Sequence, residues 1–112
     1  MKYTKDDLEK MSDFEVNKSI AIALGGYGGA VGDWLPNGVK LKKDSFFYTE
    51  FDFNDWCSIM PLAVENNLTL QNVVGRGGNY WMAGPNTYHH YCDKSPQRAI
   101  ACCLILVLQE RE

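Results

Sequence analysis

The sequence predicts an α+β fold: a small antiparallel sheet of about four strands packed with three helices, the C-terminal helix being the central core element. Three observations predict it. Helical runs with capping residues begin near residues 12, 58 and 95, and runs rich in strand formers lie between them. The last helical run is apolar on every face. The resulting order (helix, strands, helix, hairpin, helix) is typical of α+β proteins.

The C-terminal helix is predicted from Ser95 as N-cap and Pro96 as first helical residue, closing on Gln109-Glu110. No polar side chain occurs from Ala99 to Leu108, so its own domain or a partner must cover this helix all round. The run spans about 15 Å, roughly half a bilayer core, which indicates a core helix and not a membrane anchor. A face that the remaining elements fail to cover would be a dimer interface.

Length and composition indicate one domain of 112 residues, 46% hydrophobic and 22% charged. We expect a polar lead-in over residues 1–11 and a single domain over 12–112. The net charge of -3 provides no global basic field for nucleic acid or anionic membrane. The polar start lacks the apolar region of a secretory signal, so we expect a cytoplasmic location.

The cysteines are predicted to be free thiols, because a reducing compartment and a chain above a hundred residues argue against a disulfide framework. Cys102 and Cys103 fall inside the apolar helix, where free cysteine commonly behaves as a small hydrophobic residue. We interpret both as packing residues.

The first helix is predicted over Asp13–Leu24, because Ser12 and Glu15 form a capping-box pattern and Gly25-Gly26 ends the run. Its expected inner side is Phe14, Ile20, Ala21 and Leu24. The cluster Gly25–Gly29 follows a helix, whereas a dinucleotide-binding glycine loop follows a strand and opens a helix. We therefore interpret the cluster as a flexible turn.

The next segment predicts a hairpin over residues 34–41 and a strand over 45–51. Its only basic cluster is Lys40, Lys42 and Lys43, which we interpret as a solvated strand edge in preference to a phosphate contact.

A second helix follows, capped by Asn54 or Ser58. Pro61 favours Ser58, because the proline then lies in the first turn, and the helix would run from Ile59 to Glu65. The clearest hairpin pairs 68–74 with 79–83 around Gly75–Gly78. Residues 86–94 are expected to form a connecting loop.

The segment Tyr88-His89-His90-Tyr91-Cys92-Asp93 is the densest set of functional side chains. With Cys57 it offers enough ligands for zinc, but it lacks the ligand spacing of known zinc motifs. A catalytic dyad of Cys92 with His89 or His90 would need support from elsewhere in the fold. We therefore favour a polar surface loop, without catalytic residue, metal or cofactor.

Aromatic residues are the second candidate for function: a stacking platform for single-stranded nucleic acid needs a positive groove, so core packing and a protein-facing patch are favoured. Arg98, at the third helical position, opposes the helix dipole and is expected to pair with an acid, Asp55 or Glu15 being candidates. The aromatics considered are Trp34, Trp56, Tyr80, Trp81, Tyr88 and Tyr91. The predicted binding surface comprises Trp34, Trp81, Tyr88, His89, His90, Tyr91 and Arg98.

Three segments together resemble the NinX-like family of small lambdoid phage and prophage proteins: residues 12–18, residues 61–70, and Pro96–Ala99 with Gln109-Glu110 at the helix end. Ile59-Met60 departs from the Ala-Trp pair common in the family. The resemblance implies a phage or prophage origin and a bacterial host cell. It implies no catalytic residues.

Three functional hypotheses follow. The leading one is a non-enzymatic accessory protein that binds another protein, either a host factor or a second copy of itself. The alternative is a nucleic-acid-associated protein of phage DNA metabolism that uses Lys40, Lys42, Lys43 and Arg76. The third is a small-ligand or metal-binding protein centred on His89, His90 and Cys92.

Overall fold

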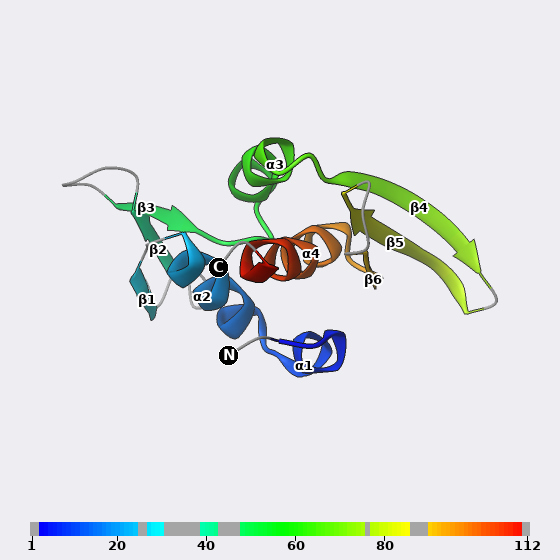
Figure 1. Cartoon of the computed structure of the whole chain (residues 1–112), viewed down its shortest axis with the longest axis horizontal. Coiled ribbons are helices and arrows are strands. Elements are labelled where there is room, and N and C mark those ends of the chain that lie inside the picture. The colour runs from blue at the N-terminus through cyan, green and yellow to red at the C-terminus, as the bar shows by residue number, and fades with distance from the viewer. Residues whose placement is uncertain are drawn as a thin grey trace.

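The computed structural model describes residues 3–24, 27–30, 39–42, 48–75, 77–85 and 90–110, with the backbone alone for 27–30, 39–42 and 48–50. These residues form four helices and two antiparallel sheets of three strands each (Figure 1). The helices are α1 (Lys5–Lys10), α2 (Asp13–Ala23), α3 (Trp56–Glu65) and α4 (Pro96–Glu110). The strands are β1 (Tyr27–Ala30), β2 (Val39–Lys42), β3 (Tyr48–Phe51), β4 (Thr69–Gly75), β5 (Gly78–Gly84) and β6 (Tyr91–Asp93). The α+β class is confirmed, with one helix and two strands more than expected.

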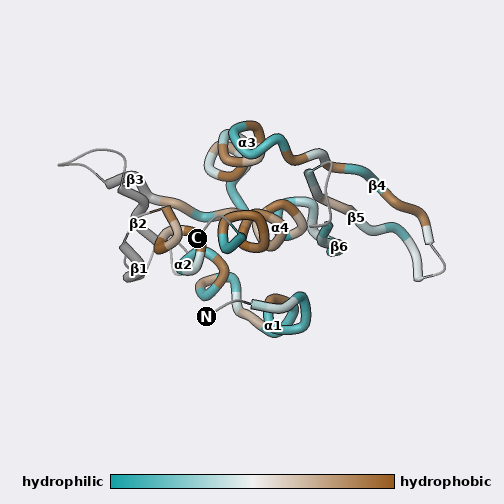
Figure 2. The backbone as a smooth tube through the Cα atoms, in the orientation of Figure 1, coloured by the Kyte–Doolittle hydropathy of each residue, from teal (hydrophilic) through white to brown (hydrophobic). Residues whose placement is uncertain are grey.

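Helix α4 is the centre of the fold, as predicted. Its N-cap is Ser95, whose Oγ accepts a hydrogen bond from the Arg98 N–H at 3.2 Å. Every residue from Ala99 to Val107 is buried, and Figure 2 shows the middle of the helix as hydrophobic, with hydrophilic residues at its two ends. It packs against α2, α3, β5 and β6. The chain itself therefore covers all faces of α4 over these residues, and no dimer interface is left there.

The N-terminal segment is a short helix, so the expected loose lead-in is wrong from Thr4 onward. Thr4 and Asp7 form a reciprocal capping box: the Thr4 hydroxyl accepts from the Asp7 N–H, and the Asp7 carboxylate accepts from the Thr4 N–H. The hydrogen bond that the Thr4 backbone N–H donates to the carboxylate, followed by the interaction with the Thr4 side chain, lowers the pKa of Asp7. Leu8 is fully buried and fixes α1 to the core.

Helix α2 follows the prediction closely. Ser12 is its N-cap, and the Ser12 Oγ accepts from the Glu15 N–H at 3.2 Å. Ile20 and Ala21 are buried as expected, while Phe14 and Leu24 are only partly buried. Val16 and Asn17, which were not predicted as core, are fully buried.

The first sheet has the order β1-β2-β3. The glycine-rich residues 27–30, expected as a flexible turn, form strand β1, because pairing with β2 outweighs their poor strand propensity. Lys40 and Lys42 lie on the central strand, so a strand edge was the wrong interpretation. The predicted strand at 45–51 is found over Tyr48–Phe51. Residues 31–38 and 43–47 lie outside the described residues.

Helix α3 begins three residues earlier than predicted. Asp55, and neither Ser58 nor Asn54, is the N-cap, and its Oδ1 accepts from the Cys57 N–H at 3.0 Å. Pro61 consequently lies inside the helix. Proline removes the hydrogen bond to the carbonyl four residues back, that of Cys57. Cys57 and Pro61 are both exposed, so the missing bond lies on the solvent-facing side of α3.

The second sheet has the order β4-β5-β6 and confirms the predicted hairpin. The hairpin extends beyond the helices in Figure 1, and only its base, at Ala83 and Gly84, is buried. The expected loop over 86–94 is wrong in part, because Tyr91–Asp93 pairs with β5 as strand β6. Residues 86–89 lie outside the described part of the chain.

Candidate protein-binding surfaces

The predicted aromatic binding surface is not one exposed patch in the part of the chain that the structure describes. Trp34, Tyr88 and His89 lie outside it. Tyr91 is buried in the core, and Trp81 on the adjacent strand is partly buried against that core. Tyr91 is therefore a packing residue, because so covered a side chain offers little area to a partner.

His90 is half-buried, and its ring lies directly over Gly84 of β5. A Cβ atom at Gly84 would collide with Cδ2 of the ring and lie 3.0 Å from its Cγ. The imidazole therefore packs on the strand. Among the residues that the structure describes, no group of three or more His, Cys, Asp or Glu could hold a metal ion.

Arg98, near the N-terminal end of α4, connects several segments of the fold, and its side chain is only 14% exposed. Its Nη1 lies 2.8 Å from Oδ1 of Asp13, and its Nε lies 3.7 Å from Oδ2 of Asp93. Its Nη2 donates to the carbonyl oxygens of Leu8, at 2.9 Å, and Met11, at 2.6 Å. The expected pairing with an acid is found, but the acids are Asp13 and Asp93; Asp55 and Glu15 were the wrong candidates.

Polar side chains extend this contact from Asp13 to the turn before α3. Asn54 Nδ2 donates to Asp13 Oδ2 at 3.1 Å, and Asn17 Nδ2 donates to Asp52 Oδ1 at 3.2 Å. Asn17 Oδ1 accepts from the Phe53 N–H at 2.8 Å. We call this set the polar junction: Asp13, Asn17, Asp52, Asn54 and Arg98. Each of these bonds joins segments distant in sequence, so the junction holds the fold together.

No buried polar side-chain atom among the described residues lacks a hydrogen-bond partner. Unsatisfied buried groups are one signature of a site that waits for a ligand. The described interior, the polar junction included, is therefore satisfied by structural bonds.

The cysteines divide into two exposed and two buried thiols, and all four are free. Cys102 and Cys103 are fully buried in α4, which confirms their packing role. Burial raises the pKa of Cys102 to about 11 and that of Cys103 to about 12. Burial, followed by the neighbouring Cys102, also raises the pKa of Tyr91. Neither buried thiol is activated as a nucleophile, since nucleophilic thiols have lowered pKa values.

Cys92 lies in an open hollow of about 450 Å³ between α1 and the second sheet. The other residues of this hollow are Glu9, Tyr80, Asp93 and Lys94. A dyad of Cys92 with His90 finds no support here, because His90 packs on Gly84 and does not line the hollow.

Helix α3 carries a line of exposed apolar side chains that the sequence reasoning missed. Trp56 is 41% exposed, Met60 40% and Val64 69%, and these residues follow one another at intervals of four. Residues four apart lie above one another on a helix, so the three form one row, which we call the α3 ridge. The opposite side of α3, with Ile59, Leu62 and Ala63, is buried, and the helix packs on α4.

The ridge was missed because the helix was expected to begin at Ile59. From that start only Met60 and Val64 share a row. Asp55 was the signal that would have revealed it: as an N-cap it adds Trp56 to the helix and completes a second apolar face.

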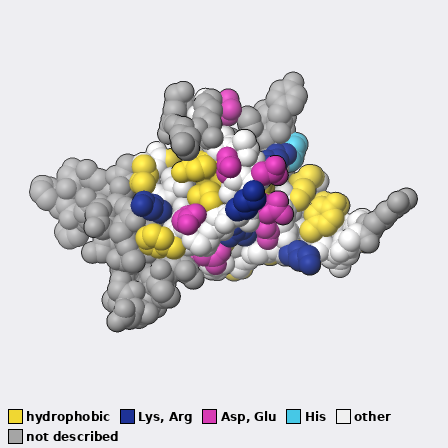
Figure 3. Space-filling view, turned by 90° about the horizontal axis from the view of Figure 1, so that it is seen from below, with side chains coloured by type: hydrophobic (Ala, Val, Ile, Leu, Met, Phe, Trp, Pro, Cys, Tyr) yellow, Lys and Arg dark blue, Asp and Glu magenta, His cyan; other side chains and the backbone are white. Residues whose placement is uncertain are grey.

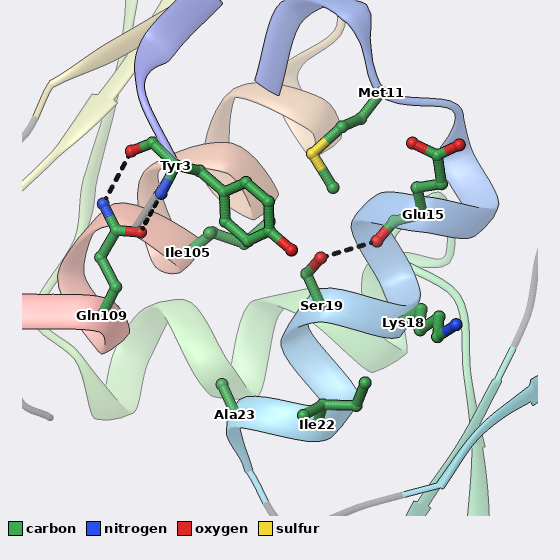
Figure 4. Close-up of a pocket in the computed structure, with 9 residues that line it drawn as sticks. All are labelled: Tyr3, Met11, Glu15, Lys18, Ser19, Ile22, Ala23, Ile105 and Gln109. Carbon is green, nitrogen blue, oxygen red and sulfur yellow. Dashed lines mark hydrogen bonds between the residues drawn. The ribbon is translucent and has the colours of Figure 1, made fainter. Parts of the chain in front are cut away.

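A second surface feature is an open groove of about 370 Å³ between α2, α4 and the N-terminal residues. Figure 4 shows the Tyr3 ring between Ile105 and Ser19, with Ile22 and Ala23 farther along α2. The Gln109 amide holds the Tyr3 backbone by two hydrogen bonds, accepting from its N–H at 2.8 Å and donating to its carbonyl at 2.9 Å. The groove thus combines apolar walls with polar groups. Its complete lining is Tyr3, Met11, Glu15, Lys18, Ser19, Ile22, Ala23, Ile105 and Gln109.

The described charges do not form a basic surface on the face seen in Figure 3, the side on which α1 and α2 lie. Acidic and basic side chains alternate there around apolar ones. The side chains of Lys40, Lys42, Lys43 and Arg76, named for the nucleic-acid hypothesis, lie outside those that the structure describes. That hypothesis stays a prediction from the sequence.

Comparison of the chain with protein-family models, curated proteins and solved structures gave no match. Within the described residues, no helix has both the length and the apolar character needed to cross a membrane.

Proposed function

We propose that this chain is a non-catalytic accessory protein of a bacteriophage or prophage that acts in the cytoplasm of the host cell by binding another protein. The origin is supported by the resemblance of three sequence segments to the NinX-like family. The binding role is supported by one observation, the α3 ridge. Tryptophan and methionine are enriched in protein interfaces, and tryptophan is prominent among the residues that carry most of the binding energy.

Composition of the exposed face of α3 strengthens this proposal. Glu65 is the only charged residue on it. A surface helix normally turns charged and polar residues to solvent. The exposed residues of α3 are Trp56, Cys57, Met60, Pro61, Val64 and Glu65.

Capture of host-lysate proteins by the tagged full chain tests the proposal, with two matched variants. Val64→Ser removes an apolar side chain from the ridge. Val74→Ser makes the same substitution on β4, where the side chain is 80% exposed. We expect wild type and Val74→Ser to retain the same partner, and Val64→Ser to lose most of it. Thermal melting of all three proteins is the control that checks whether each variant folds like wild type.

Equal retention by Val64→Ser and wild type would overturn the proposed role of the ridge. Light scattering on the same proteins identifies the self-association form of the hypothesis: a wild-type dimer that Val64→Ser dissociates makes the partner a second copy of this chain.

The groove between α2 and α4 favours a second candidate function, the binding of a small amphipathic molecule. Its volume falls within the range of small-molecule sites, and it offers an apolar wall beside hydroxyl, amide and charged groups. This relocates the small-ligand hypothesis away from His89, His90 and Cys92. Methyl NMR spectra during titration with a fragment library test it: shifts confined to Ile22, Ala23 and Ile105 are expected, and shifts elsewhere alone would exclude the groove.

A further inference from the structure

The α3 ridge has the dimensions of a contact with one helix. Trp56 and Val64 are eight residues apart, so the row is about 12 Å long, which matches about two turns of a partner helix. Rows of residues four apart are the ridges that pack into the grooves of another helix. An amphipathic helix that places apolar residues three or four apart on one face presents the matching surface.

The charged residues of α3, of its N-cap and of the segments that flank it in sequence are all acidic. Asp55 and Glu65 stand at the two ends of α3, and both are exposed. From Asp44 to Gly75, both included, the sequence contains five acidic residues and no lysine, arginine or histidine. A partner that covers the ridge therefore meets negative charge at both of its ends, and complementary potentials favour a positive one.

The same charges disfavour the other occupants. A second copy in antiparallel orientation would bring Asp55 of one chain beside Glu65 of the other, and a parallel copy would pair each acid with itself. Both arrangements place like charges together at an interface. An anionic membrane surface attracts basic amphipathic helices, whereas the exposed face of α3 carries no basic residue.

We propose that the α3 ridge binds an amphipathic helix whose apolar face is flanked by lysine or arginine. This inference rests on the proposed function and adds the chemical class of the partner. Trp56, Met60 and Val64 supply the apolar contact. Asp55 and Glu65 select for basic flanks.

Two synthetic peptides test this directly with the full chain. Both are amphipathic helices with identical leucine positions; one carries lysine and the other glutamate at the remaining positions. Binding is measured by fluorescence anisotropy of the labelled peptide. The lysine peptide is expected to bind about tenfold or more tightly than the glutamate peptide, and its affinity is expected to fall as salt screens the charges.

Four variants separate ridge from charge. Met60→Ser/Val64→Ser is expected to weaken binding of the lysine peptide about tenfold. The apolar control Val74→Ser is expected to weaken this binding less than about twofold. Asp55→Asn/Glu65→Gln removes both charges, and asparagine at position 55 can still cap the helix. This variant is expected to bind the lysine peptide about fivefold more weakly. Asp6→Asn/Glu9→Gln removes the same number of charges from exposed positions of α1 and is expected to change affinity less than about twofold.

Three results would overturn the inference: equal binding of the two peptides, equal losses in the two charge variants, or a wild-type dimer that Val64→Ser dissociates. If the chain binds the two peptides with equal affinity while Val64→Ser still loses the lysate partner, the inference fails and the proposed function stands. If the lysate partner is retained by Val64→Ser, the proposed function itself fails.

Discussion

Arg98 Nη1 lies 2.8 Å from Asp13 Oδ1, and this ion pair between residues 85 positions apart joins the first turns of α4 and α2. A cation in the first turn of α4 opposes the helix dipole. Here the guanidinium also reaches the carbonyl oxygens of Leu8 and Met11 at the end of α1, and Asp13 lies in the first turn of α2. The C-terminal end of α1 favours the positive guanidinium, and the N-terminal end of α2 favours the negative carboxylate of Asp13. These two contacts offset the unfavourable position of Arg98 in its own helix.

Replacing Arg98 by glutamine should lower the free energy of unfolding by about 2–3 kcal/mol. The substitution removes hydrogen bonds from a largely buried charged group and takes the Arg98 donor away from the Met11 carbonyl, while the Leu8 carbonyl keeps its bond from the Met11 N–H. Urea denaturation measures the loss. Arg98→Lys, which keeps the charge but not the planar fork, should fall between wild type and glutamine. An unchanged melting temperature in Arg98→Gln would contradict the structural role.

Replacing Asn17 by alanine should destabilise the protein by about 2 kcal/mol, because the N–H of buried Phe53 would lose its acceptor. Ser19→Ala provides a control on the same helix. The Ser19 hydroxyl only bonds back to the Glu15 carbonyl at the surface, so its loss should change stability by less than about 0.5 kcal/mol. Similar losses in both variants would show that the Asn17 bond to Phe53 adds little.

The elements that the sequence predicted well are those whose signals are local. Helix α4 combines a Ser-Pro start with an unbroken apolar run, and the β4–β5 hairpin has glycines at its turn. Helix α1 has only one buried apolar residue, Leu8, and depends on a polar capping box. The missed strands depend on partners: β1 is rich in glycine and β6 has three residues. Pairing, which the local sequence does not encode, makes them strands.

The candidate site shows the same division. That Arg98 needs an acid follows from its place in the helix; that the acid is Asp13 depends on how α2 and α4 pack. Likewise, the exposure of Trp56, Met60 and Val64 depends on which side of α3 meets α4. Tyr91 was misread because an aromatic in a polar stretch resembles a surface residue, while strand pairing turns its side chain into the core.

Replacing Gly84 by alanine should displace the His90 ring and cost about 1–3 kcal/mol, because the added methyl group occupies the position of the imidazole. Gly77→Ala is the control, since a Cβ there meets nothing within 4 Å. Chemical denaturation gives the cost, and NMR of the imidazole protons reports the displacement. If crowding is the cause, Gly84→Ala should cost much less in a His90→Ala background.

Maleimide labelling of the native protein should modify Cys57 and Cys92 and spare Cys102 and Cys103. The first pair is exposed and the second is fully buried with raised pKa values. Mass spectrometry after proteolysis identifies the labelled thiols. In urea all four should react at similar rates. Early native-state labelling of Cys102 would show that α4 is less well covered than its burial indicates.

Stability should fall as the pH rises above about 9, because Cys102 and Cys103 keep their protons in the folded protein to a higher pH than in the unfolded chain. Their folded pKa values are about 11 and about 12, against an ordinary value of 9.0. Between these limits the unfolded state binds fewer protons, so unfolding becomes more favourable with each pH increment. Each thiol contributes at most about 1.4 kcal/mol per pH unit, and below about pH 8 neither contributes a slope. Urea denaturation from pH 8 to pH 11 measures the dependence.

Cys103→Ala is the comparison that assigns this slope. The variant is expected to be less stable at pH 8 because its core packing changes, but its stability should decline less steeply than that of wild type between pH 9 and pH 11. Tyr91, whose pKa is also raised by burial, adds a decline of the same sign in both proteins at the upper end of this range. Parallel curves for wild type and Cys103→Ala would mean that the buried thiol of Cys103 does not govern the alkaline loss.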